Sequence, residues 1–265
     1  MNYSAPLSLV LIPGWSMPAA ALEPLAESLS GEWPVTILQW PTELEVWQHQ
    51  DSLLDAMAAQ LPEGPVVLVG WSLGGQIASL LAAVKGCKNK LSVQYGVASG
   101  REREDKREKI KGLITLASNP RFVANQDWPF GMDQHTFKAF QQGFNQFPAK
   151  TLKEFCLLVA KGAGNYRATA KSLQQLQSQV DLSHEVLAEG LKLLATLDTR
   201  CLLQQLTCPQ LHLLAEQDAL VNHQLVEWFQ QQILPVTSFA KTGHYLMTEA
   251  DEVASQIKQF VVECN

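Results

Sequence analysis

Short apolar runs alternate with segments of helical periodicity along the first part of the chain. Runs of strand length lie at residues 7–12, 35–38, 66–69 and 113–117. Helical spacing of apolar residues lies between these runs, at residues 20–29, 48–60 and 76–83. Strand–helix alternation of this kind predicts an α/β fold, with a mostly parallel sheet flanked by helices.

The alternation is interrupted in the middle of the chain. Residues 119–184 hold no convincing strand, but they carry many aromatic residues with helical periodicity between turn signals. We therefore predict a helical cap at 119–186. This cap is inserted between two parts of one α/β core, at 1–118 and 187–265.

Strand–helix alternation resumes after the predicted cap. Apolar runs lie at 210–215 and 236–239, and helical periodicity follows each of them, at 221–234 and 249–262. Asn222 is expected to be the N-cap of the first of these helices, because its side chain can accept from the free N–H groups of a first turn.

The sequence Gly70-Trp71-Ser72-Leu73-Gly74 follows directly after one of the apolar runs. The pattern Gly-x-Ser-x-Gly between a strand and a helix is typical of a nucleophile elbow, a sharp turn that holds the serine in strained backbone geometry. Side chains in place of either glycine would crowd the crossing of strand and helix. Because a predicted helix follows, we predict that the serine is a catalytic nucleophile. A plain Gly/Ser turn is the alternative.

A serine hydroxyl needs a base, an acid that orients the base, and donors for the developing oxyanion. In enzymes built around such an elbow, the chain order is Ser, then Asp or Glu, then His. Asp218 lies three residues past the strand that ends at Ala215, and His244 lies between a predicted strand and a predicted helix. We predict Asp218 as the acid and His244 as the base. Glu216 is the rival acid, but it lies too close to the strand end to reach the base as well.

The other histidines fit the role of base less well. They lie before the elbow, in the predicted cap, within a strand, or directly after the predicted acid: His49, His135, His184, His212 and His223. For His212, inside the strand at 210–215, an ordinary core or surface role is expected.

Two backbone N–H groups are expected to hold the oxyanion. One belongs to Leu73, which directly follows the nucleophile, and the other comes from the loop at residues 13–16. In that loop Gly14 allows a close approach, and Trp15 is the candidate donor. The side chains of Trp15 and Trp71 are candidate walls of the substrate pocket, with plain core packing as the alternative. This chemistry requires no metal ion and no organic cofactor.

Composition adds limits on size, partners and compartment. The chain has 265 residues, of which 46% are hydrophobic and 17% are charged, and this suits one sizeable globular unit. The formal net charge of −6 gives no support for nucleic-acid binding. The start of the chain does not resemble a signal peptide, and no apolar stretch is long enough to span a bilayer. Five scattered cysteines without a Cys-x-x-Cys pair favour reduced thiols, so we expect a cytoplasmic protein. We also expect a monomer.

An unbroken run of charges of both signs lies at residues 101–109. It belongs to an insertion at about 87–110, on the side of the predicted sheet away from Ser72. We expect a solvated surface excursion there, and a segment that docks a partner is the alternative.

Several stretches match a known family. They lie at residues 14–15, 70–75, 116–122, 127–129, 140–142, 197–200, 218–221 and 243–244. On these residues the chain resembles the α/β-hydrolases that carry a helical cap. More narrowly, it resembles the BioH family of pimeloyl-[acyl-carrier-protein] methyl ester esterases of biotin synthesis. The elbow and triad are generic, whereas the Ser-x-Pro-x-Phe…Trp-Pro and Phe-Gln-Gln stretches are more particular.

The resemblance implies hydrolysis of a methyl ester at the far end of an acyl chain that is carried on acyl carrier protein. It implies that Phe140 and Phe144 of the cap line the substrate pocket together with Trp15 and Trp71. It also implies that basic residues of the cap meet the acidic carrier. The candidates by position, for which an ordinary solvated surface role is the alternative, are Arg121, Lys138, Lys150 and Lys153.

Some features depart from the pattern of this family. Pro13 replaces the usual His before Gly14, and Ala215 replaces the usual Gly at the end of the acid's strand. The Asp-x-Pro-Gly-x-Gly loop after the second strand is replaced by Gln-Trp-Pro-Thr at residues 39–42, and the charged insertion is extra. None of these changes removes a member of the triad. They leave the substrate open, because loops that face the pocket have changed.

Other functions remain open on the sequence alone. The same scaffold hosts short-chain esterases, thioesterases and a menaquinone-pathway lyase that uses the triad for proton abstraction. It can also serve as a non-catalytic binding module, which the charged run favours and the intact triad opposes. A serine carboxylesterase that uses Ser72, His244 and Asp218 is our leading hypothesis.

Overall fold

The structure is a computed structural model, and it describes residues 5–83 and 109–263. The predicted insertion at about 87–110, with its charged run at 101–109, lies outside the described residues except for residues 109 and 110. Within the described part of the chain, no helix has the length and apolar character needed to cross a membrane.

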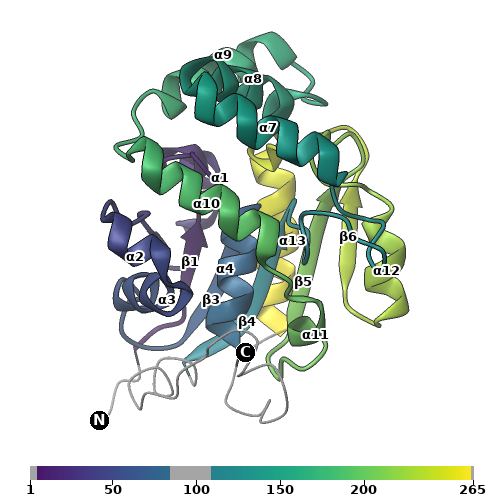
Figure 1. The fold of residues 1–265 in the computed structure, drawn as a ribbon. Coiled ribbons are helices and arrows are strands. Elements are labelled where there is room, and N and C mark those ends of the chain that lie inside the picture. Colours follow the sequence, from purple (N-terminus) through teal and green to yellow (C-terminus); the bar gives the residue numbers. More distant parts are fainter. Residues whose placement is uncertain (1–4, 84–108, 264–265) are drawn as a thin grey trace.

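Six parallel strands form one sheet in the order β2-β1-β3-β4-β5-β6 (Figure 1). Their bounds are β1 (Ser8–Ile12), β2 (Val35–Ile37), β3 (Val66–Trp71), β4 (Ile110–Leu116), β5 (Gln210–Ala215) and β6 (Val236–Phe239). Strands β1 and β3 are buried along their whole length, as expected for parallel strands that are covered on both faces. The predicted α/β class is confirmed, and each strand predicted from an apolar run is present.

Helices cover both faces of the sheet. On one face α1 (Glu23–Leu29) packs against α13 (Ala250–Glu263). On the other face α4 (Leu73–Ala82) contacts α3 (Gln50–Ala59) and α11 (Arg200–Leu203). The shorter elements beside them are η1 (Ala19–Leu22), α2 (Leu44–Gln48), α12 (Leu225–Gln231) and η2 (Leu246–Glu249).

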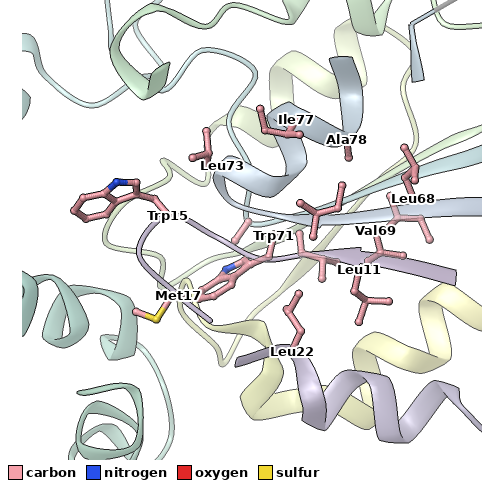
Figure 2. Packing of buried hydrophobic residues seen from close by; sticks show 14 of the residues in the cluster. Leu11, Trp15, Met17, Leu22, Leu68, Val69, Trp71, Leu73, Ile77 and Ala78 are labelled. Carbon is pink, nitrogen blue, oxygen red and sulfur yellow. The ribbon is translucent and has the colours of Figure 1, made fainter. Parts of the chain in front are cut away.

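The core continues through the sheet from one helical layer to the other. Figure 2 shows Ile77 and Ala78 of α4 on one side of the strands and Leu22 of η1 on the other, with Leu11 and Val69 on the strands themselves. All five side chains are buried. Close packing on both faces fixes the strand ends, from which the loops of the site emerge.

Four longer helices lie beyond the carboxyl ends of the strands. They are α7 (Gln134–Gln146), α8 (Pro148–Ala160), α9 (Tyr166–Gln177) and α10 (His184–Thr196). Figure 1 shows α7, α8 and α9 grouped above the sheet, with α10 running below them. Helix α8 contacts both α7 and α9, and α10 contacts α7 and α2. The segment at 119–186, all of which is described, contains α7, α8, α9 and the first three residues of α10, together with isolated bridges and without a strand.

Helix α12 is shorter than the helix predicted at 221–234, and Asn222 lies before it, so the prediction of Asn222 as the N-cap is wrong. The preceding residues are held in a turn instead. The carboxylate of Asp218 accepts hydrogen bonds from the N–H groups of Leu220 (2.7 Å) and Val221 (2.9 Å). An acid that binds its own loop in this way delays the start of the next helix.

Candidate active site

Ser72 lies at the turn between β3 and α4. Its backbone has φ 55° and ψ −118°, a conformation that costs a non-glycine residue strain energy. The N–H of Ser72 donates to the carbonyl of Leu116 (2.9 Å), and its own carbonyl accepts from the hydroxyl of Ser118 (2.8 Å). These bonds to the end of β4 hold the strained turn. A β-carbon on Gly74 would overlap the carbonyl oxygen of Ile12, so the crossing has room only for glycine.

His244 and Asp218 meet on the loops that follow β6 and β5. Nδ1 of His244 lies 2.8 Å from Oδ2 of Asp218, and both side chains are 1% exposed. The other carboxylate oxygen, Oδ1, accepts the two backbone hydrogen bonds of the turn described above. The carboxylate is therefore fixed, and its contact with the imidazole engages Nδ1 and not Nε2. The rival acid Glu216 is exposed.

Trp71 links the predicted base to the predicted nucleophile. Its indole Nε1 donates to the backbone carbonyl of His244 (2.9 Å), and the two rings lie 5.8 Å apart. Because Trp71 directly precedes Ser72, the loop that carries His244 is tied to the elbow. Tyr245 adds a second anchor, since its hydroxyl donates to the carbonyl of Ala21 (2.7 Å). Burial raises the pKa of this hydroxyl to about 12, so it remains a donor.

The loop after β1 approaches the elbow closely. A β-carbon added to Gly14 would lie 3.3 Å from Cβ of Ser72. The indole of the next residue, Trp15, donates to the carbonyl of Leu187 on α10 (2.9 Å). Its ring packs edge to face, at centroid distances of 5.0 to 5.8 Å, against Phe140, Phe144 and Phe155. The loop thus faces Ser72 on one side and the helices beyond the sheet on the other, and Figure 2 shows Trp15 extending away from the strands.

Ser72 lies at the wall of an apolar pocket. The pocket encloses about 520 Å³ of empty space, part of which is open to solvent. The other lining residues come from the loop after β1, from α7, α8 and α10, and from segments beside them. They are Trp15, Phe122, Met132, Thr136, Phe137, Phe140, Phe155, Leu158, Leu191, Leu194 and Leu220. None of these side chains is charged, so the pocket suits an apolar chain better than an ionised group.

The four residues predicted to wall the substrate pocket take two different places. Trp15 and Phe140 are in the lining. Phe144 is fully buried against the ring of Trp15, and Trp71 packs against the loop of the predicted base. Neither Phe144 nor Trp71 is among the described residues that line the pocket.

None of the pocket lining that comes from α10 was predicted from the sequence. Leu191 and Leu194 face the pocket from this helix. The signal was present, because Leu187, Leu191 and Leu194 recur with helical spacing. It indicates a helix, but no local pattern indicates that the helix lies against the elbow.

The turn between α8 and α9 packs directly on the loops that carry the predicted acid and the predicted base. A β-carbon on Gly243, just before the predicted base, would overlap the carbonyl oxygen of Lys161. A β-carbon on Gly162, which has φ 91°, would lie 2.7 Å from the carbonyl oxygen of Gln217, just before the predicted acid. Backbone therefore meets backbone at this contact, which ties the helices beyond the sheet to the site.

The four basic residues predicted to dock a carrier protein also differ in their surroundings. Three are exposed on α7 and α8, namely Lys138, Lys150 and Lys153. Arg121 is mostly buried, and its guanidinium pairs with Asp198 (3.0 Å), which also pairs with Arg200 (2.6 Å). Burial alone would raise the pKa of Asp198, but hydrogen bonds from Arg200 and Arg121 outweigh it and lower that pKa. Arg121 is thus part of a structural ion-pair cluster.

Comparison with known proteins assigns the chain to a family. A model of the family described as "Alpha/beta hydrolase family" matches residues 9–256. The chain is 30% identical over 260 residues to a pimeloyl-[acyl-carrier protein] methyl ester esterase of Vibrio parahaemolyticus, with 95% of this chain and 93% of that protein covered. It is 35% identical over 263 residues to the biotin biosynthesis bifunctional protein BioHC of Cellvibrio japonicus. That match covers 95% of this chain but 47% of the relative, so the chain spans about half of its length.

A solved structure agrees with this assignment at the level of the fold. An esterase (EaEST) from Exiguobacterium antarcticum superposes with a TM-score of 0.76, and the match covers 97% of this chain and 92% of that one. The sequence identity is 17%, so the likeness concerns the arrangement of the elements and not their chemistry.

Proposed function

Because the chain belongs to the alpha/beta hydrolase family, and within it to the pimeloyl-[acyl-carrier-protein] methyl ester esterases, we propose that it cleaves an acyl methyl ester with a Ser72–His244–Asp218 triad. The chain is a carboxylic ester hydrolase. The observation that carries the proposed triad is the 2.8 Å contact between His244 and Asp218, on a loop tied to the strained serine.

In the proposed mechanism, Oγ of Ser72 attacks the ester carbonyl carbon while Nε2 of His244 takes the hydroxyl proton. The Asp218 carboxylate accepts a hydrogen bond from Nδ1–H of His244. This bond selects the tautomer with a basic Nε2 and stabilises the imidazolium that forms. When the tetrahedral intermediate collapses, His244 returns the proton to the leaving alkoxide and methanol departs. Water then cleaves the acyl-enzyme by the same route, and Ser72 is restored.

The backbone N–H groups of Leu73 and Trp15 are the proposed donors to the oxyanion. Leu73 is the first residue of α4, where N–H groups have no partner inside the helix and the helix dipole is positive. Trp15 follows the glycine that lies against Ser72. Both donors therefore belong to rigid segments beside the nucleophile, which is the arrangement that stabilises a developing negative charge.

The pocket supports the proposal of an acyl substrate. The described residues that line it carry no charged side chain, so a methylene chain and a neutral ester fit, whereas a buried free carboxylate would be costly. The relative from Vibrio parahaemolyticus carries the name of its substrate, a pimeloyl-[acyl-carrier protein] methyl ester. We extend this substrate, and a role in biotin synthesis, to the present chain. In this proposal the segment at 119–186 acts as a cap over the pocket.

The proposed carrier-protein surface lies on α7 and α8. Lys138, Lys150 and Lys153 are exposed there and would attract an acidic partner through long-range electrostatics. Arg121 is left out of this surface because its charge is engaged with Asp198 inside the structure.

The first experiment compares turnover of pimeloyl-[acyl-carrier-protein] methyl ester with turnover of a short p-nitrophenyl ester. We expect the wild-type protein to prefer the carrier-bound ester. In Ser72→Ala, kcat for both substrates is expected to fall by at least about 10³-fold, because no other group replaces the nucleophile. Full activity of Ser72→Ala would contradict the triad. Serine-dependent activity on the short ester alone would keep the mechanism and reject the carrier-bound substrate.

A further inference from the structure

Trp40, in the loop after β2, touches the segment that carries one proposed oxyanion donor. Its indole Nε1 donates a buried hydrogen bond to the carbonyl oxygen of Gly14 (3.1 Å). The same oxygen accepts a second bond from the N–H of Met17 (3.3 Å). A carbonyl oxygen has two lone pairs, and both are engaged here. The peptide between Gly14 and Trp15 therefore cannot rotate without losing two hydrogen bonds.

The peptide that Trp40 holds is the one whose N–H is proposed to bind the oxyanion. A peptide unit is planar and trans, so the carbonyl of Gly14 and the N–H of Trp15 point in opposite directions. Fixing the carbonyl therefore fixes the direction of the N–H. A hydrogen bond to the carbonyl also polarises the peptide, which makes the N–H a stronger donor. Because Gly14 lies against Ser72, this direction is set beside the reacting atom.

Trp40 is itself held on both sides along the chain. Before it, the backbone N–H and carbonyl of Gln39 each form a 2.9 Å hydrogen bond with the side-chain amide of Gln60. After it, the carbonyl of Pro41 accepts from the indole of Trp47 (2.8 Å). The ring of Trp47 also packs against the ring of Trp40, at a centroid distance of 5.3 Å. The donor to the oxyanion loop is thus a fixed part of the scaffold.

We propose that Trp40 is a positioning residue that sets the oxyanion donor through the carbonyl of Gly14. The inference rests on the proposed function, because it requires the N–H of Trp15 to face a developing negative charge. It gives a role to residues 39–42, the loop at which this chain departs from the pattern of the family it resembles.

The test replaces Trp40 by Phe, which keeps an aromatic ring against Trp47 and removes the N–H donor. Trp228→Phe is the matched control, because it shortens a similarly buried indole on α12 (9% exposed, against 7% for Trp40). The readouts are kcat and KM on a p-nitrophenyl ester and the inhibition constant of a boronic acid, which forms a tetrahedral adduct with Ser72. Thermal unfolding of each variant measures the loss of packing alone.

We expect Trp40→Phe to lower kcat by about tenfold with KM nearly unchanged, a smaller loss than removal of an oxyanion donor itself causes. The affinity for the boronic acid should fall by a similar factor, since the adduct carries the same oxyanion-like group. Trp228→Phe should keep both values. Trp47→Phe, which releases the carbonyl of Pro41 and loosens the loop, should lower kcat in the same direction by a smaller factor, and it tests the inference independently if Trp40→Phe folds poorly.

Three results would overturn the inference: an unchanged kcat in Trp40→Phe, a change confined to KM, or an equal loss of kcat in Trp228→Phe. Ser72→Ala distinguishes failure of the proposed function from failure of the proposed role of Trp40. If Ser72→Ala stays active, the proposed function fails and this inference fails with it. If Ser72→Ala is inactive while Trp40→Phe keeps its kcat and its boronic-acid affinity, only the role of Trp40 is rejected.

Discussion

At the scale of single residues, His212 shows what burial in the sheet does to an ionisable group. Its side chain is fully buried in β5, where Nδ1 lies 2.7 Å from the hydroxyl of Thr115. The imidazole also stacks on the ring of Phe229, at a centroid distance of 4.1 Å. Burial lowers the pKa of His212 to about 3, so the ring stays neutral in the folded protein well below pH 7.

This burial predicts a loss of stability in mild acid. The unfolded chain protonates His212 near pH 6.5, whereas the folded protein does so only near pH 3. The stability that neutral His212 contributes is therefore present above pH 6.5 and is lost as the pH falls toward 3. Between pH 7 and pH 5, the free energy of unfolding should fall by about 2 kcal/mol more in the wild type than in His212→Gln. Urea unfolding at the two pH values measures this difference, and parallel pH dependences would contradict it.

The residues of the proposed triad and Trp40 differ in how far the sequence reveals them. Ser72, Asp218 and His244 each follow a strand that is visible as an apolar run, and their order along the chain is diagnostic. Parallel strands end at one edge of the sheet, so the loops that carry these residues meet. Trp40 also follows a strand, but its partner Gly14 lies 26 positions away and the contact depends on how two loops pack. No local pattern predicts such a hydrogen bond.

At the scale of elements, strands were predictable and helix ends were not. Strands covered on both faces appear as continuous apolar runs, which have little else to be confused with at that length. The helix predicted at 48–60 is α3 (Gln50–Ala59), and it begins two residues later than predicted, because His49 adopts an extended backbone with φ −128° and ψ 119° that separates it from α2. Such a break depends on one pair of dihedral angles, and the period of the apolar residues does not reveal it.

The elbow makes a prediction at this scale. In Gly74→Ala the added methyl group would overlap the carbonyl of Ile12 at the crossing of loop and helix. Alanine is the better helix former by about 1 kcal/mol, but the overlap should outweigh this gain and destabilise the protein by about 2 kcal/mol or more. The melting temperature should fall, and activity should fall with it as Ser72 shifts. Gly31→Ala, which meets open space, is the control, and a melting temperature unchanged in Gly74→Ala would contradict the close crossing.

At the scale of the whole molecule, the pocket belongs to no single part of the chain. Its walls come from the loop after β1, from α7 and α8, from α10 and from the loop after β5. The break in strand–helix alternation predicts an inserted helical segment, but it does not predict which faces of those helices turn toward Ser72. That arrangement depends on contacts between residues more than a hundred positions apart, such as Trp15 with Leu187.

Because several elements contribute to the pocket, a single lining residue such as Phe140 is expected to limit the size of the acyl group that fits. Phe140→Ala removes a ring from the lining, so longer or bulkier acyl groups should gain relative to short ones. We expect the ratio of kcat/KM for p-nitrophenyl octanoate to that for the butyrate to rise by about fivefold. Phe147→Ala is the matched control, because Phe147 is 63% exposed and does not line the pocket. A ratio that changes equally in both variants, or in neither, would place Phe140 outside the acyl site.

The contact between the α8–α9 turn and the loop before His244 sets a condition for recombination among relatives. A chimera that receives α7, α8 and α9 from another protein also receives the turn that rests on Gly243 and Gln217. If the donor turn carries a side chain where Gly162 stands, that side chain must push against Gln217 and Gly243, in the loops of the proposed acid and base, however well the new helices match the substrate. Whether the chimera folds with an intact site therefore depends on the contact between Gly162 and Gly243. Both glycines have to be transferred together.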